Sequence, residues 1–159
     1  MGQPGRFTLE DCNIFYLNFA GREGPYNNDR TFCVALPEDV AQELKADGWN
    51  VKVREGKEEG DPDVPYLAVK VSYENRPPRI TMITSAGRFL LKESQLEMLD
   101  YADIVKVDIV VNPYVWRMSD GKEGVKAYLK TMFITIDEDD LERKYAEDDD
   151  HLPPEDEEE

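Results

Sequence analysis

The sequence contains very little of the chemistry that metal sites and redox centres use. Its only cysteines are Cys12 and Cys33, and its only histidine is His151. A zinc site usually needs four Cys or His ligands at regular spacings, and these three residues do not form such a set. Cys33 lies in the apolar run TFCVAL, where we expect a buried free thiol. We therefore expect no metal, no cofactor and a protein of the reducing cytoplasm.

Long apolar runs and catalytic motifs are also missing. No segment reaches the roughly 18 apolar residues of a membrane span, and the start MGQPGRFTLED lacks the basic and apolar regions of a signal peptide. Arg6 stands where a myristoylation motif has Ser or Thr. The chain has no glycine-rich phosphate loop, no nucleophile elbow and no histidine in its body to act as a base. We therefore expect a protein that is not an enzyme.

The excess of negative charge belongs to one end of the chain. The formal net charge is −16, yet from Asp137 onward 14 acidic and two basic residues give −12, which leaves only −4 for the body. Hydrophobicity collapses in the same region, so we predict a folded body over 1–138 and a disordered acidic tail over 139–159. The tail acids to which we assign a role are Asp148, Asp149, Asp150, Glu155, Asp156, Glu157, Glu158 and Glu159.

The body has the short, punctuated apolar runs of β-strands. Runs rich in β-branched and aromatic residues lie between turn residues at 13–21, 31–36, 51–53, 66–73, 80–84, 104–118 and 124–136. The run 31–36 is so apolar that we expect both of its faces to be buried. Two short helices are expected, at 37–48 and at 94–102, the second after a capping box that begins at Ser94. This order indicates an all-β barrel or sandwich with helical decoration.

The last two strands are the most informative part of the sequence. They face each other across SDGKE, in which Asp120-Gly121 is a hairpin signal. Alternation places one set of apolar residues on a single face, namely Val105, Val107, Ile109, Val111, Val125, Ala127, Leu129 and Phe133. The other face holds Tyr114, Trp116, Lys126, Tyr128 and Lys130. The hairpin is therefore expected to have an aliphatic face toward the core and an aromatic–basic face.

An aromatic–basic face suits a single strand of nucleic acid. Unpaired bases stack on aromatic rings at about 1–3 kcal/mol per base, while Lys and Arg follow the phosphates. Further candidates are Arg76, Arg79 and Arg88 around the strand 80–84, and Arg22, Tyr26 and Arg30 around the preceding loop. The same residues also fit a solvated sheet surface or a wall beneath a helix. Trp116 fits a core position as well as a stacking position.

One stretch resembles a known family. DIVVNPYVWRMSDGKEGVKAYLKTMFITI resembles the closing strands of the acidic-tailed single-stranded DNA-binding proteins of tailed phages. In that family a strand ending in Pro-Tyr-x-Trp turns back into a Val-Lys-rich strand, and Pro113, Tyr114, Trp116 and Lys126 match these positions. The resemblance implies an OB-fold, a five-stranded Greek-key barrel that binds oligonucleotides across one face, here with extra strands and two short helices.

The resemblance also implies a function in phage DNA replication or recombination, in the cytoplasm of the host. Such a protein coats single strands without sequence preference, and its affinity falls steeply with salt. Its tail competes with DNA and contacts a polymerase, helicase or recombinase. A homodimer is compatible with the sequence, which does not fix the oligomeric state. Tails of the family commonly end on an aromatic residue, whereas this one ends EDEEE, which favours an electrostatic role. An acidic DNA mimic that inhibits a DNA-binding enzyme and a structural protein of a virion are the alternatives.

Overall fold

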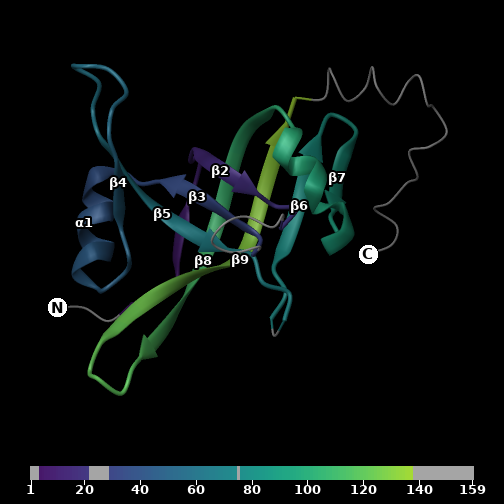
Figure 1. Cartoon of the computed structure of the whole chain (residues 1–159). Coiled ribbons are helices and arrows are strands. Elements are labelled where there is room, and N and C mark those ends of the chain that lie inside the picture. The colour runs from purple at the N-terminus through teal and green to yellow at the C-terminus, as the bar shows by residue number, and fades with distance from the viewer. Residues whose placement is uncertain (1–3, 22–28, 75, 138–159) are drawn as a thin grey trace.

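The computed structural model describes residues 4–21, 29–74 and 76–137. Strands dominate these residues, with one α-helix and one 3₁₀ helix beside them (Figure 1). In chain order the elements are β1 (Phe7–Leu9), β2 (Ile14–Asn18), β3 (Thr31–Ala35), α1 (Glu38–Ala46), β4 (Lys52–Arg54), β5 (Val64–Lys70), β6 (Arg79–Thr84), β7 (Gly87–Leu90), η1 (Glu93–Tyr101), β8 (Ile104–Arg117) and β9 (Glu123–Ile136). The mostly β prediction is confirmed, although β1 and β7 were not predicted.

The strands form a barrel that the N-terminal segment closes. The sheet order is β1-β8-β9-β5-β3-β2, with β5 parallel to β9 and the other neighbours antiparallel. The two outer strands of this order are consecutive in the chain. Between them, Cys12 N donates to Val107 O at 2.9 Å and Ala35 N donates to Asn13 O at 2.9 Å, which ties the segment to both edges. If β1 and β2, which follow each other in the chain, are counted as one strand, these six segments give the five strands of the predicted OB-like fold.

The barrel interior is filled by alternate residues of its strands. Phe32 and Val34 of β3 and Val69 of β5 are fully buried, and the ring of Phe19 stacks on that of Phe32 at 5.4 Å. Burying each such side chain contributes about 1.5–3 kcal/mol before conformational entropy is counted. The expectation that segment 31–36 is buried on both faces is wrong. Its alternate residues Thr31, Cys33 and Ala35 are only half-buried, because the outer face of β3 lies open beside β5.

Two extra units decorate the barrel. In chain order, helix α1 and strand β4 are inserted after β3 and before β5. Strands β6 and β7 and the 3₁₀ helix η1 are inserted after β5 and before β8. Strand β6 adds to the C-terminal half of β9, and Leu96 and Leu99 of η1 are fully buried. The capping box predicted at Ser94 is wrong by two residues, because the helix starts at Glu93. There Gln95 Oε1 accepts from Lys92 N at 2.7 Å.

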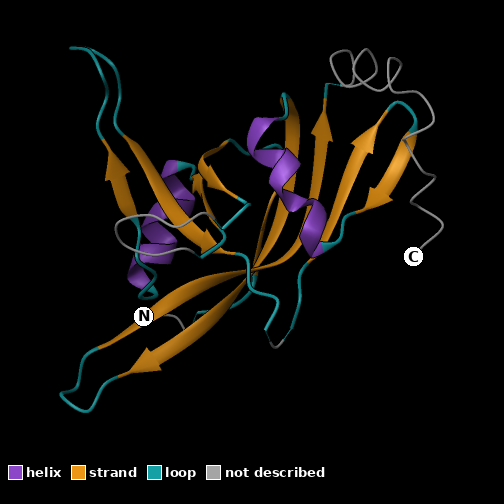
Figure 2. Ribbon diagram, turned by 45° about the vertical axis from the view of Figure 1, so that its right-hand side comes forward, coloured by secondary structure: helices purple, strands orange, loops and turns teal. Residues whose placement is uncertain are grey.

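Strands β8 and β9 continue beyond the barrel as a two-stranded arm (Figure 2). Strand β1 pairs with β8 only up to Val111, and β5 pairs with β9 only around Ala127. Beyond these points the two strands pair with each other, apart from one bridge between Trp49 and Val125. The arm, residues 114–126, turns at Gly121, whose φ of 93° is the left-handed value the predicted hairpin turn requires.

Candidate nucleic-acid interface

A groove opens on the outer side of the barrel between β5 and the arm. Its volume is about 510 Å³. Thr31 of β3 and Ala68 and Lys70 of β5 line its barrel side, and Trp116 and Lys126 line its arm side. Buried Trp49, which follows α1, lies at its border. Outward positions on β3 and β5, the second and third strands of the barrel, are where OB-folds bind oligonucleotides.

The arm presents the aromatic–basic face that alternation predicts. Tyr114 is paired with Lys126 across the strands, and its side chain is 56% exposed. Tyr128 lies next to this pair, with its ring centroid 6.0 Å from that of Tyr114. Val125 and Ala127, on either side of Lys126, are buried. Two rings and an ammonium group thus lie together on one outward surface.

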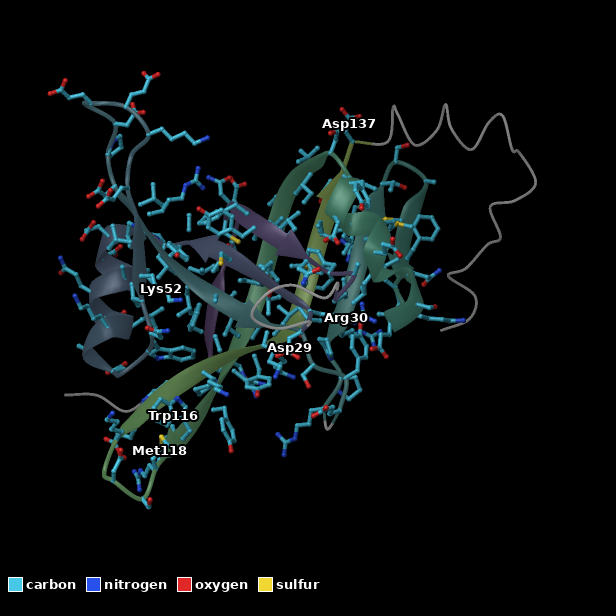
Figure 3. The ribbon with its side chains drawn as sticks, in the orientation of Figure 1. Asp29, Arg30, Lys52, Trp116, Met118 and Asp137 are labelled. Carbon is cyan, nitrogen blue, oxygen red and sulfur yellow. The ribbon has the colours of Figure 1, made fainter. Side chains whose placement is uncertain are left out.

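Trp116 lies in the groove rather than in the core. It is half-buried and pairs with Gly124, and a Cβ atom on Gly124 would lie 2.6 Å from Trp116 Cζ2. The indole therefore packs flat over a position where only glycine leaves room. Figure 3 shows Trp116 on the arm, with Met118 near its tip. Of the two roles that the sequence leaves open for Trp116, the core role is wrong.

The barrel side of the groove adds a cation that the sequence did not single out. Lys70 follows the outward parity of β5 and pairs with Tyr128 of β9. Its Nζ lies 5.9 Å from the centroid of the Tyr128 ring and 3.2 Å from Asp29 Oδ2. The ammonium group of Lys70 is therefore already paired with the carboxylate of Asp29. The alternation of Leu67, Val69 and Val71, all buried, was the sequence signal that placed Lys70 outward.

A β-bulge changes the second half of the predicted face. Leu129 pairs with Val111 and Thr131 with Val110, so Lys130 is an extra residue without a partner across the strands. After an extra residue the alternation of faces inverts. Phe133, expected in the core, is consequently 37% exposed, and the core positions pass to Met132, Ile134 and Ile136.

Val105 was also expected in the core and is 63% exposed. The register shifts between Ile104 and Lys106, which leaves Val105 without a pairing partner on β9. The neighbouring core predictions for Val107, Ile109 and Val111 are confirmed, since all three are buried.

The predicted arginines do not gather in the groove. Arg79 pairs with Thr131 at the start of β6, and Arg88 of β7 lies 5.9 Å from the centroid of the Phe133 ring. Both are exposed on the β6–β7 extension, as is Arg76 in the turn before it. Arg79 and Arg88 lie beside the C-terminal half of β9, beyond the bulge. Lys130 is exposed at the bulge itself.

Arg30 has a structural position. Its Nη1 donates to Phe19 O at 2.6 Å, and its Nη2 lies 3.3 Å from Glu93 Oε2. It thus ties the end of β2 to the start of η1. Tyr26 and Arg22, together with every tail acid to which a role was assigned, lie outside the described residues.

A second aromatic group, which was not predicted from the sequence, lies on the same outer face. The rings of Phe15, Tyr16 and Tyr66 pack edge to face, with centroids 4.8 Å apart for Phe15–Tyr16 and 5.4 Å for Phe15–Tyr66. Arg54 Cζ lies 4.7 Å from the centroid of the Phe15 ring. Partial burial raises the pKa of the Tyr66 phenol, and the neighbouring Cys33 and Tyr16 raise it further. This group is called the β2 aromatic cluster below.

Two kinds of reactive group can be checked directly in the described residues, metal clusters and thiols. No group of three or more His, Cys, Asp or Glu side chains there is placed to hold a metal ion. Burial raises the pKa of the Cys12 thiol to about 11 and also raises that of Cys33, so neither is an activated nucleophile. Among the described helices none has the length and apolarity to cross a membrane.

Solved structures show where this fold occurs elsewhere. The single-stranded DNA-binding protein from bacteriophage Enc34 is 12% identical with a TM-score of 0.54, and the match covers 82% of this chain and 80% of that one. The same protein in complex with ssDNA matches with the same identity and TM-score, over 82% of this chain and 85% of that one. No curated protein sequence matches the chain.

A family model covers almost the whole sequence. It is described as "Putative phage ssDNA-binding domain" and matches residues 3–158, which includes both the barrel and the acidic tail. The name of the family and those of the structural relatives describe binding proteins rather than enzymes. The chain belongs to the family of phage single-stranded DNA-binding domains.

Proposed function

We propose that the groove and the aromatic–basic face of the arm hold a segment of single-stranded DNA with little sequence preference. The observation that carries the proposal is the juxtaposition of Tyr114, Tyr128 and Trp116 with Lys70 and Lys126 on one outer face. Rings on this face stack with any base, and each ammonium group neutralises a phosphate. The Enc34 protein, which shares the fold, has been solved in complex with ssDNA.

The charges of the groove set how strongly salt acts on binding. Lys70 is paired with Asp29, and Glu123 is paired with Arg117 at 3.0 Å, so Lys126 is the groove cation without a described acidic partner. One to two neutralised phosphates give a slope of log K against log salt of about −0.7 to −1.4. This slope is shallower than the steep dependence expected from the sequence. Stacking therefore provides the larger part of the binding free energy.

The biological role follows from sequence-independent binding. A protein of this kind coats single strands during phage DNA replication or recombination and keeps them free of hairpins. The acidic tail, residues 139–159, acts as a tethered competitor for the same cations, because tethering gives it a high effective concentration near the groove. Once DNA displaces it, the tail is free to contact a basic surface of a polymerase, helicase or recombinase.

Fluorescence anisotropy with labelled oligo-dT at several salt concentrations tests this function. The full chain is compared with a chain ending at Lys144, which keeps every described residue. Both should bind, and the shortened chain should bind more tightly at low salt. Absence of binding by the shortened chain at low salt contradicts the proposal. If the full chain instead binds a DNA-processing enzyme and blocks its DNA site, the protein is an acidic DNA mimic.

The site assignment is tested separately. Tyr114→Ala removes a ring from the face, and Lys126→Ala removes the unpaired cation. Each should weaken oligo-dT binding by about fivefold or more, and only Lys126→Ala should lower the salt slope, by about 0.7. Lys45→Ala, on the exposed side of α1, is the matched control. Parent-like binding by both variants would place the site elsewhere.

A further inference from the structure

The β2 aromatic cluster is built by an irregularity in strand β2. Neighbouring residues of a regular strand point to opposite faces, yet the rings of Phe15 and Tyr16 pack against each other. The register of β2 against β3 shifts between Phe15 and Asn18, and Ile14 and Leu17 are the residues that pack against the core. A β-bulge thus directs two consecutive rings outward, which is a recognised use of bulges beside functional sites.

The backbone at this bulge is strained. Tyr16 has a φ of 53°, in the left-handed region that is unfavourable for a non-glycine residue. Its side chain is nevertheless 60% exposed, so burial of the ring does not repay this cost. Strained residues of this kind concentrate at ligand-binding sites. The position of Tyr16 is accordingly better explained by a ligand than by packing.

Cations accompany the rings. Arg54 of β4 lies 4.7 Å from the Phe15 centroid and 5.7 Å from the Tyr16 centroid, and no described carboxylate is paired with it. Lys52 on the same strand pairs with Tyr66 and is exposed. Exposed rings beside arginine and lysine provide what an unpaired base and its phosphate need.

The cluster and the groove share one surface. Tyr66, Ala68 and Lys70 are alternate residues of β5 and point to the same side, and Ala68 is an exposed residue of the groove. The distance from Tyr66 to Lys70 along the strand is about 13 Å at 3.3 Å per residue. Cys33 and Ala68 form a floor of small side chains between the two ends, with Phe15 paired to Cys33 on the far side. A strand in the groove can therefore continue over Ala68 toward the cluster.

We propose that the β2 aromatic cluster is a second base-stacking site, which takes the bases of a single strand where it leaves the groove across β5. The proposal rests on the proposed function, since the same DNA occupies both sites. Tyr16 provides an exposed ring and Tyr66 a half-buried one, Phe15 packs against both, and Arg54 and Lys52 contact the phosphates. The second site lengthens the stretch of DNA that one chain covers.

Oligo-dT of two lengths separates the sites. OB-folds bind about 4 to 16 nucleotides each, so an oligomer of about four fills the groove alone and one of about sixteen reaches the cluster. Tyr66→Ala and Tyr16→Ala should weaken binding of the long oligomer about fivefold or more and leave the short one unchanged. Tyr66→Phe and Tyr16→Phe should bind both like the parent. Tyr101→Ala removes an exposed tyrosine of η1 and is the control.

The outcomes distinguish the two proposals. If the parent binds neither oligomer, the proposed function fails. If the parent binds both and Tyr66→Ala, shown to be folded by its circular dichroism and melting curve, also binds both equally well, only the second site fails. Equal losses with both oligomers would also overturn it, because the rings would then act on the groove itself. A loss of self-association with unchanged DNA binding would make the cluster a protein interface instead.

Photo-crosslinking provides a readout that needs no substitution. A long oligomer carrying 5-iododeoxyuridine should crosslink at Tyr16 or Tyr66, and the short one should crosslink only at residues of the arm and at Lys70, with the crosslinked residue assigned by fragmentation of each peptide. Crosslinks of the long oligomer confined to the arm and to Lys70 would contradict the second site.

Discussion

Replacing Asp29 by Asn should strengthen DNA binding while slightly weakening the fold. Asp29 Oδ2 lies 3.2 Å from Lys70 Nζ, and both side chains are partly exposed. A pair of this kind contributes about 0.2–1 kcal/mol to stability. A phosphate that takes the place of Asp29 at Lys70 must break the pair and approach the displaced carboxylate. Repulsion between two unit charges about 6 Å apart in water is about 0.7 kcal/mol.

The two terms together give about 0.9–1.7 kcal/mol, so Asp29→Asn should bind oligo-dT roughly 5- to 17-fold more tightly. The melting temperature should fall by up to about 4 °C. Anisotropy at low salt measures the first effect and thermal unfolding the second. Glu43→Gln, an exposed acid of α1, changes the net charge equally and should leave both unchanged. Affinity of Asp29→Asn equal to or below that of the parent would refute the assignment of Lys70 to a phosphate.

Three further substitutions or modifications probe the surface. Gly124→Ala should displace the indole of Trp116, shift its fluorescence and weaken oligo-dT binding with little loss of stability; unchanged fluorescence would contradict the packing. Arg30→Ala should lower the melting temperature and leave DNA affinity nearly unchanged, since the hydrogen bond and ion pair of Arg30 are internal. A loss of DNA affinity with an unchanged melting temperature would instead make Arg30 a DNA contact. Thiol alkylation followed by peptide mass spectrometry should become faster as pH rises toward each raised pKa, which for Cys12 is about 11. Saturating DNA should protect Cys33, which lies between the groove and the β2 aromatic cluster; equal rates with and without DNA would oppose the path over Ala68.

The sequence was sufficient for elements that local chemistry determines. The arm could be predicted because Asp120-Gly121 demands a hairpin and the flanking strands alternate clearly. The outward direction of Tyr114, Lys126 and Tyr128 followed from the same alternation. Strands β1 and β7 escaped prediction because three or four residues carry too little periodicity, and because β1 depends on pairing with a distant strand.

Bulges set the limit of the site prediction. One extra residue, Lys130, inverts the alternation of β9, which is why Phe133 was expected inside and lies outside. Nothing in the sequence NIFYLN indicates the bulge in β2, so two adjacent rings on one face could not be predicted. The sequence made Arg30 a candidate nucleic-acid contact because its partners, Phe19 O and Glu93, come together only in the fold.

The closure of the barrel by its N-terminal segment constrains how the protein folds. Strand β1 pairs with β8, and Arg6 Nε donates to Asn112 Oδ1, 106 positions further along the chain, at 2.8 Å. On the ribosome, β1 therefore has no partner until β8 has emerged, and the last strand, β9, must pair with β5 and β6 before the core is complete. Such distant contacts slow folding. The barrel therefore closes only after β9 has emerged, and until then β5 and β6 lack the strand that lies beside them in the fold.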